Sequence, residues 1–176
     1  MDTGALYAVE KFALTGRETA ASLSLRCADI GARLAAATLD AIEKGLARAV
    51  PQRGEPSYCR KITKEDGLVD WGSSCRDIDA RIRAFNPWPG SHTCLQERRL
   101  TILEAEPCPD TEPSPAKEAL PKAAPGTIIG VDKTRGILVQ TGEGLIALRK
   151  LQFAARKALD HRAFANGFRG LKGLRF

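Results

Sequence analysis

The residues that could do chemistry in this sequence are its cations, because they gather at one end of the chain. From residue 149 to the C-terminus there are eight Lys or Arg residues and one acidic residue, a net +7 in a chain whose overall net charge is +6. Clustered guanidinium and ammonium groups favour a polyanionic partner. The candidate phosphate ligands are Arg149, Lys150, Arg156 and Lys157. Only Phe153 interleaves with them, so phosphate contacts are expected rather than base stacking. Ordinary solubilising charge at a C-terminus is the alternative.

A second, smaller group of cations follows a linker. Residues 51–57 carry two prolines and no periodic pattern, which is typical of a linker. Arg60, Lys61 and Lys64 come directly after it. These side chains could also contact phosphates, although a solvated charged turn is the commoner setting for such a run. The residues alone leave both interpretations open.

The five cysteines indicate a reducing compartment rather than a metal or disulfide site. Their number is odd, no two of them form a CxxC pair, and the two histidines, His92 and His161, are far apart in the sequence. We therefore expect free thiols, no metal ligands and a cytoplasmic protein. No stretch approaches the roughly 18 apolar residues of a membrane span, so no membrane partner is expected.

Two regions with different periodicity must position the cations. Residues 6–14 are expected to form a short strand, and residues 18–49 repeat apolar side chains at helical spacing. After the linker, residues 77–85 predict a helix capped by Ser73 or Ser74. The period then changes to two, which predicts five short strands. These strands cover residues 92–95, 100–106, 126–131, 137–141 and 145–151.

The remaining segments are expected to be a loop and a terminal helix. Residues 107–125 contain six prolines, which predicts a long mobile loop. Asp160 is expected to cap a last short helix that runs through Phe164. The predicted fold class is α+β. It comprises a terminal strand–helix piece of an α/β domain over residues 1–50, the linker 51–57, and an OB-like antiparallel β-barrel with a short helix over residues 58–176.

Several segments, in order along the chain, carry a family resemblance. They are residues 58–66, Asp70-Trp71, residues 83–90 with the run Asn86-Pro87-Trp88-Pro89-Gly90, then Pro125-Gly126-Thr127-Ile128, Thr141-Gly142-Glu143-Gly144, Leu151-Gln152 and Arg156-Lys157-Ala158. Together they resemble the C-terminal region of the methionyl-tRNA formyltransferase family, over essentially the whole chain. The Asn-Pro-Trp-Pro-Gly run is the most specific of them, and it is interpreted as structural, with Trp88 buried.

The resemblance implies the C-terminal portion of a two-domain enzyme. In this family an α/β domain transfers a formyl group from 10-formyltetrahydrofolate to the amino group of initiator methionyl-tRNA, and an OB-like domain holds the tRNA. Residues 1–50 would then be the end of the formyltransferase catalytic domain, and residues 58–176 the tRNA-binding domain. Asp2 would be the aspartate of the family's catalytic Asp-Thr-Gly loop. The two groups of cations would contact the tRNA.

This chain alone is expected to be inactive. The family's catalytic asparagine and histidine come from an earlier strand and loop, and most of the donor site is expected to be missing as well. The full-length enzyme is expected to be a monomer. One alternative is a non-catalytic RNA-binding module from a truncated gene. Another is an enzyme that transfers formyl to a nucleotide-sugar amine, against which the Asn-Pro-Trp-Pro-Gly run argues.

Overall fold

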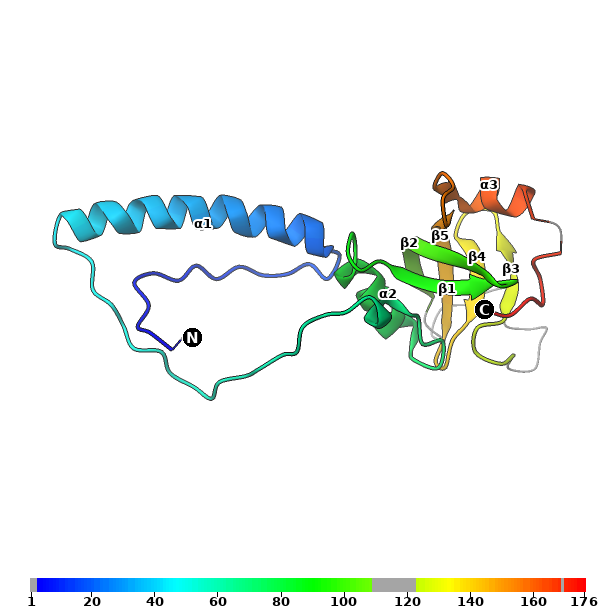
Figure 1. The fold of residues 1–176 in the computed structure, drawn as a ribbon, viewed down its shortest axis with the longest axis horizontal. Helices are drawn as coiled ribbons and strands as arrows, with labels where there is room; N and C mark the ends of the chain where they lie inside the picture. The colour runs from blue at the N-terminus through cyan, green and yellow to red at the C-terminus, as the bar shows by residue number, and fades with distance from the viewer. Residues whose placement is uncertain (1–2, 109–122, 169) are drawn as a thin grey trace. The chain divides into compact units, whose positions relative to one another are not determined.

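The computed structural model describes residues 3–108, 123–168 and 170–176, and the chain divides into two units between Lys61 and Ile62. The first unit is built around one long helix and the second around an antiparallel sheet (Figure 1). Asp2 lies outside the described residues, as does most of the loop expected over residues 107–125.

The helix of the first unit, α1 (Ala20–Glu43), begins and ends at residues suited to those positions. Thr19 Oγ1 accepts a hydrogen bond from Ser22 N at 3.1 Å, and Ser22 Oγ accepts one from Thr19 N at 2.9 Å, which is a capping box. Gly45, with φ +68°, follows the last turn in the left-handed conformation that commonly ends helices. The helix therefore ends earlier than the predicted residue 49.

The strand predicted over residues 6–14 is wrong. Leu6 forms a single antiparallel bridge with Val50, with 2.8 Å hydrogen bonds in both directions, and the rest of this segment has no regular secondary structure. A strand needs partners for its backbone groups, and the described part of the first unit contains no second strand to supply them.

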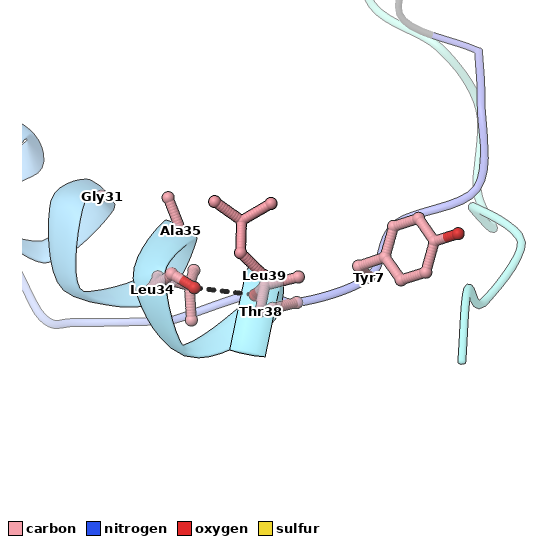
Figure 2. A pocket seen from close by; sticks show the side chains of 7 residues that line it. Tyr7, Gly31, Leu34, Ala35, Thr38 and Leu39 are labelled. Carbon is pink, nitrogen blue, oxygen red and sulfur yellow. Dashed lines mark hydrogen bonds between the residues drawn. The ribbon is translucent and has the colours of Figure 1, made fainter. Parts of the chain in front are cut away.

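One face of α1 borders an open apolar hollow of about 430 Å³, shown in Figure 2. Its lining consists of Tyr7, Ala8, Gly31, Leu34, Ala35, Thr38 and Leu39. Thr38 Oγ1 donates to Leu34 O at 2.7 Å, so its hydroxyl is satisfied within the helix. No residue of α1 is fully buried, and Leu25 and Leu39 are 75% and 66% exposed.

The second unit is a six-stranded antiparallel sheet with two helices (Figure 1). Its elements are a 3-10 turn η1 (Glu65–Gly67), α2 (Cys75–Ala84), β1 (Ser91–Leu95), β2 (Arg98–Cys108), β3 (Ile128–Asp132), β4 (Gly136–Gln140), β5 (Leu145–Phe153), β6 (Leu159–Asp160) and α3 (His161–Asn166). The strand order is β1-β2-β5-β4-β3, and β6 pairs with β5. All five predicted strands and both predicted helices of this unit are present. Among the described residues the two end strands, β1 and β3, do not pair with each other, so the hydrogen bonds of the sheet do not close into a ring.

Both faces of the sheet are apolar at its centre. Ile137 and Val139 of β4 point into the main core cluster, which also holds Ile78 and Ile82 of α2, whereas Leu138 points into a second cluster on the other face. This alternation explains why β4 has four consecutive buried residues. Ser74 Oγ accepts from Asp77 N at 3.1 Å, which confirms the predicted cap of α2.

The two tryptophans differ in burial. Trp71 is 8% exposed, stacks on Phe176 with ring centroids 5.0 Å apart, and donates to Thr93 Oγ1 at 3.2 Å, so it belongs to the core. Trp88 is 55% exposed, so its predicted burial is wrong. Gly90 N donates to Phe85 O at 2.9 Å, and the loop therefore closes on its own backbone rather than over the indole.

Candidate nucleic-acid interface

Two of the predicted phosphate ligands, Arg149 and Lys150, are engaged with carboxylates on the neighbouring strand. The register of β2 and β5 places Glu104 opposite Lys150, with 3.4 Å between Glu104 Oε1 and Lys150 Nζ. Arg149 forms an ion pair with Glu106, whose register partner on β5 is Ala147. A phosphate would have to compete with these carboxylates, so the two cations are weaker candidates than sequence spacing indicates.

The other two predicted cations, Arg156 and Lys157, lie in the turn that follows β5, with exposed side chains. The turn is held by two hydrogen bonds: Arg156 N donates to Phe153 O at 3.0 Å, and Gln152 Nε2 donates to Arg156 O at 2.8 Å. Neither cation forms an ion pair within the described part of the chain. Both line an open hollow of about 630 Å³, called here the Phe153 hollow. Its lining comprises Arg98, Phe153, Ala155, Arg156, Lys157, Leu159, Phe164, Gly167 and Phe168.

Three phenylalanines form one wall of the Phe153 hollow. The ring centroids of Phe153 and Phe164 are 5.4 Å apart, those of Phe153 and Phe168 are 6.2 Å apart, and those of Phe164 and Phe168 are 5.9 Å apart. The interplanar angles are 24°, 22° and 2°, so the rings are nearly parallel. Phe164 is buried, whereas Phe153 and Phe168 are half-buried and present part of their surface to the hollow.

Arg98 completes the rim, and a turn of uncommon geometry places it there. Its guanidinium carbon lies 4.0 Å from the centroid of the Phe153 ring, a cation–π contact. Gln96 and Glu97 both have positive φ, 49° and 62°, as a two-residue hairpin turn requires. Strand β2 begins at Arg98, two residues before the strand predicted from residue 100, and it pairs Leu100 with Phe153.

Helix α3 positions the aromatic wall. Asp160 Oδ1 accepts from Ala163 N at 2.8 Å, which confirms the predicted cap, and this hydrogen bond lowers the pKa of Asp160 below its usual value. At the same end of the helix, Arg162 Nε donates to Lys133 O at 3.0 Å, and the His161 ring contacts the same carbonyl. Arg162 thus ties α3 to the β3–β4 turn.

The remaining predicted cations belong to different units. Arg60 and Lys61 end the first unit, and Lys64, exposed just before η1, belongs to the second. Of the predicted site residues, the Phe153 hollow contains only Arg156 and Lys157. Sequence reasoning missed Arg98, Phe164 and Phe168. The four-residue spacing of Phe164 and Phe168, which extends from the predicted last helix, is the signal that could have found two of them.

The Phe153 hollow has the lining of a binding site. Its lining offers three cations and an aromatic wall, which suit a planar, anionic ligand.

Within residues 3–108, 123–168 and 170–176, no group of three or more His, Cys, Asp or Glu residues is arranged to hold a metal ion. All five cysteines are free thiols. Among the helices of these ranges, none has the length and apolar character to cross a membrane.

Comparisons with known proteins agree on one family. Residues 61–169 match the model of "Formyl transferase, C-terminal domain". The chain is 38% identical over 167 residues to a methionyl-tRNA formyltransferase of Treponema denticola, covering 94% of this chain and 51% of that protein. It is 34% identical to one from Pelotomaculum thermopropionicum, covering 95% and 50%. The chain thus spans about half the length of these curated relatives.

A solved structure resembles the fold over almost the whole chain. HypX from Aquifex aeolicus, in a multiply substituted variant, superimposes with a TM-score of 0.66 and 18% identity, covering 98% of this chain and 30% of HypX. A second structure of HypX, in complex with tetrahydrofolic acid, gives a TM-score of 0.63 at 17% identity. At this identity the likeness concerns the fold alone, while the family match rests on sequence. The chain belongs to the formyl transferase C-terminal domain family.

Proposed function

We propose that this chain is the tRNA-binding portion of a methionyl-tRNA formyltransferase, and that its second unit grips the RNA at the Phe153 hollow. The main support for this proposal is a set of three cations on the rim of the aromatic-walled hollow, within the region that matches the family. They are Arg98, Arg156 and Lys157. No carboxylate of the described residues forms an ion pair with these three cations, and such cations are suited to nucleic-acid phosphates.

The names of the relatives support a proposal for the activity of the whole protein. We infer that it transfers a formyl group to the amino group of methionyl-tRNA, since its relatives are named methionyl-tRNA formyltransferase. We further propose that this tRNA is the initiator and that the reaction serves translation initiation in the cytoplasm. For the donor we propose 10-formyltetrahydrofolate. The support is that a structure of similar fold was solved with tetrahydrofolic acid. The full-length enzyme is proposed to act as a monomer.

The same proposal assigns a role to each segment of the chain. Residues 1–50 are proposed to end the catalytic domain, with Asp2 as its aspartate, residues 51–57 to link the domains, and residues 58–176 to bind tRNA. For the last of these we propose an OB-like barrel. One core cluster supports this, because it takes side chains from all five long strands, including both end strands, through Leu95 and Ile128. A sheet curled around one core has this property.

The salt dependence of tRNA affinity tests the proposed binding at the Phe153 hollow. Arg156→Gln and Lys157→Gln are each expected to weaken binding of initiator tRNA and to reduce the slope of log affinity against log salt by about one, since each removes about one phosphate contact. Lys150→Gln is the matched control, because its ammonium faces Glu104 and should change the slope little. Unchanged affinity and slope in both rim variants would contradict the proposal.

The three cations that follow the linker 51–57, namely Arg60, Lys61 and Lys64, are proposed as additional phosphate ligands. Charge reversal at Arg60 or Lys64 is expected to weaken tRNA binding at low salt, and Lys61 is proposed to contribute in the same way. Binding equal to that of the parent chain would remove this group from the interface while leaving the Phe153 hollow unaffected.

A formyl-transfer assay tests the expected lack of turnover. The chain, 10-formyltetrahydrofolate and methionine-charged initiator tRNA are mixed, and formylmethionine is quantified. No formylation above the enzyme-free background is expected, because these 176 residues span only about half the length of the curated relatives. Turnover would show that the chain catalyses the reaction itself.

A further inference from the structure

We infer that the Phe153 hollow takes up a single unpaired nucleobase, stacked on its phenylalanine wall, with the adjoining phosphate on Arg156 and Lys157. This inference rests on the proposed RNA binding. It adds that the hollow binds a base removed from helical stacking, in addition to backbone phosphates.

The wall has the geometry of a stacking platform. The rings of Phe164 and Phe168 are inclined by 2° and have their centroids 5.9 Å apart, and Phe153 is inclined to them by 24° and 22°. Because Phe164 is 3% exposed and Phe168 is half-buried, the first ring is held by the core and the second offers its surface. A nucleobase stacks on such a ring whatever its identity, because every base has a π face.

Arg98 shows that this wall already accepts a flat, delocalised group. Its guanidinium lies over the Phe153 ring at 4.0 Å and so occupies that ring. Phe168 remains as the surface for a base, with Arg98 at the edge of the same hollow.

The cations on the rim favour an anionic ligand, and the volume of the hollow suits a single nucleotide. None of the described residues that line the hollow is acidic. The nearby Asp160 carboxylate is engaged as the cap of α3. About 630 Å³ lies within the range of roughly 300–1,000 Å³ typical of small-ligand sites. Bases in a duplex are stacked on their neighbours, so a base that enters must come from a loop, bulge or strand end.

The test uses the 176-residue chain and a single-stranded RNA hexamer with a central 2-aminopurine, whose fluorescence falls when it stacks. Binding is followed in parallel by anisotropy of a dye at the RNA end. We expect quenching to saturate together with the anisotropy. Phe168→Leu should abolish the quenching and lower hexamer affinity about tenfold, because base–aromatic stacking contributes on this scale. Phe168→Trp should retain both signals.

Phe85→Leu is the matched control, since Phe85 is a half-buried aromatic of the same unit that does not line the hollow. Thermal unfolding of each variant identifies any loss of fold, and the retained signals of Phe168→Trp keep the test valid if Phe168→Leu is unstable. Saturating anisotropy without quenching, or equal affinity of the parent and Phe168→Leu, would overturn the stacking inference while the salt-dependent grip stands. No anisotropy change in any form would overturn the proposed grip instead.

Adenosine monophosphate distinguishes an RNA base from a free nucleotide. Resistance of the quenched hexamer to millimolar mononucleotide supports RNA as the ligand. Displacement at micromolar concentrations would assign the Phe153 hollow to a free nucleotide and overturn the RNA inference.

Discussion

Ion pairing divides the four cations predicted near the C-terminus into two pairs. Lys150 and Arg149 face Glu104 and Glu106 across two strands, whereas Arg156 and Lys157 project from a turn at the mouth of an aromatic hollow. The net charge of a segment cannot distinguish these cases, because the glutamates lie more than forty residues away along the chain. Strand register decides which cations remain available for a phosphate.

Asp132 gives a pH-dependent prediction. Its Oδ1 accepts hydrogen bonds from Arg135 N at 2.8 Å and from Thr134 N and Oγ1, both at 2.7 Å. These bonds, with that from Arg135 N the most important, lower the pKa of Asp132 from 3.8 to about 2. The folded pKa lies below the unfolded one, so ionised Asp132 stabilises the fold fully above the unfolded value, and this contribution is lost as the pH falls through about 2.

We therefore expect Asp132→Ala to lower the melting temperature at about pH 6, with the difference from the parent chain shrinking as the pH falls from about 4 to about 2. Thermal unfolding followed by circular dichroism over this range provides the measurement. A difference that stays constant down to pH 2 would show that the loss comes from the turn's packing and not from the ionised carboxylate.

At the scale of elements, the turn between β4 and β5 docks α2 onto the sheet. Gly142 N donates to Trp71 O at 2.9 Å and to Ser73 O at 3.0 Å, and Cys75 N at the start of α2 donates to Glu143 O at 2.9 Å. A Cβ at position 142 would lie 1.9 Å from Gly72 O, a separation that real atoms do not tolerate. The glycine is required for this close approach of two backbones.

Gly142→Ala is thus expected to destabilise the second unit by about 1–3 kcal/mol or more, the range for forcing extra atoms into a packed site. Gly130→Ala in β3 is the control, because a Cβ there meets nothing within 4 Å. Denaturant unfolding compares the two. Equal stabilities would mean that the turn relaxes freely and does not fix α2.

The elements of the second unit were predictable because their signals are local. Alternating apolar residues, the Ser74 and Asp160 caps and the Gly-containing turns each act within a few residues. The failures concern non-local partners. The strand over residues 6–14 had no neighbour to pair with among the described residues, and the burial of Trp88 depended on how its loop closed. The aromatic wall was missed for the same reason, since Phe153 meets Phe164 and Phe168 only after α3 folds back on β5.

At the scale of the whole molecule, the two units differ in how their elements are supported. The second unit contains side chains with essentially no exposure in three strands, such as Leu100, Val139 and Leu148. In the first unit, no residue of α1 is buried. The segments before and after α1 contact each other through the Leu6–Val50 bridge and through a 2.8 Å hydrogen bond from Gln52 Nε2 to Gly4 O. Helix stability in proteins comes mainly from packing of the apolar face, which α1 lacks within its own unit.

Amide hydrogen exchange should therefore divide the chain into two classes. Amides of β4 and β5 are expected to exchange only through global unfolding of the second unit, whereas those of α1 should exchange through local opening at a much smaller free energy. Mass-spectrometric exchange at several protein concentrations measures both. Protection of α1 equal to that of β4 at all concentrations would contradict the prediction. Protection that rises with concentration would mean that a second copy of the chain covers the apolar face of α1, which includes Leu34 and Leu39.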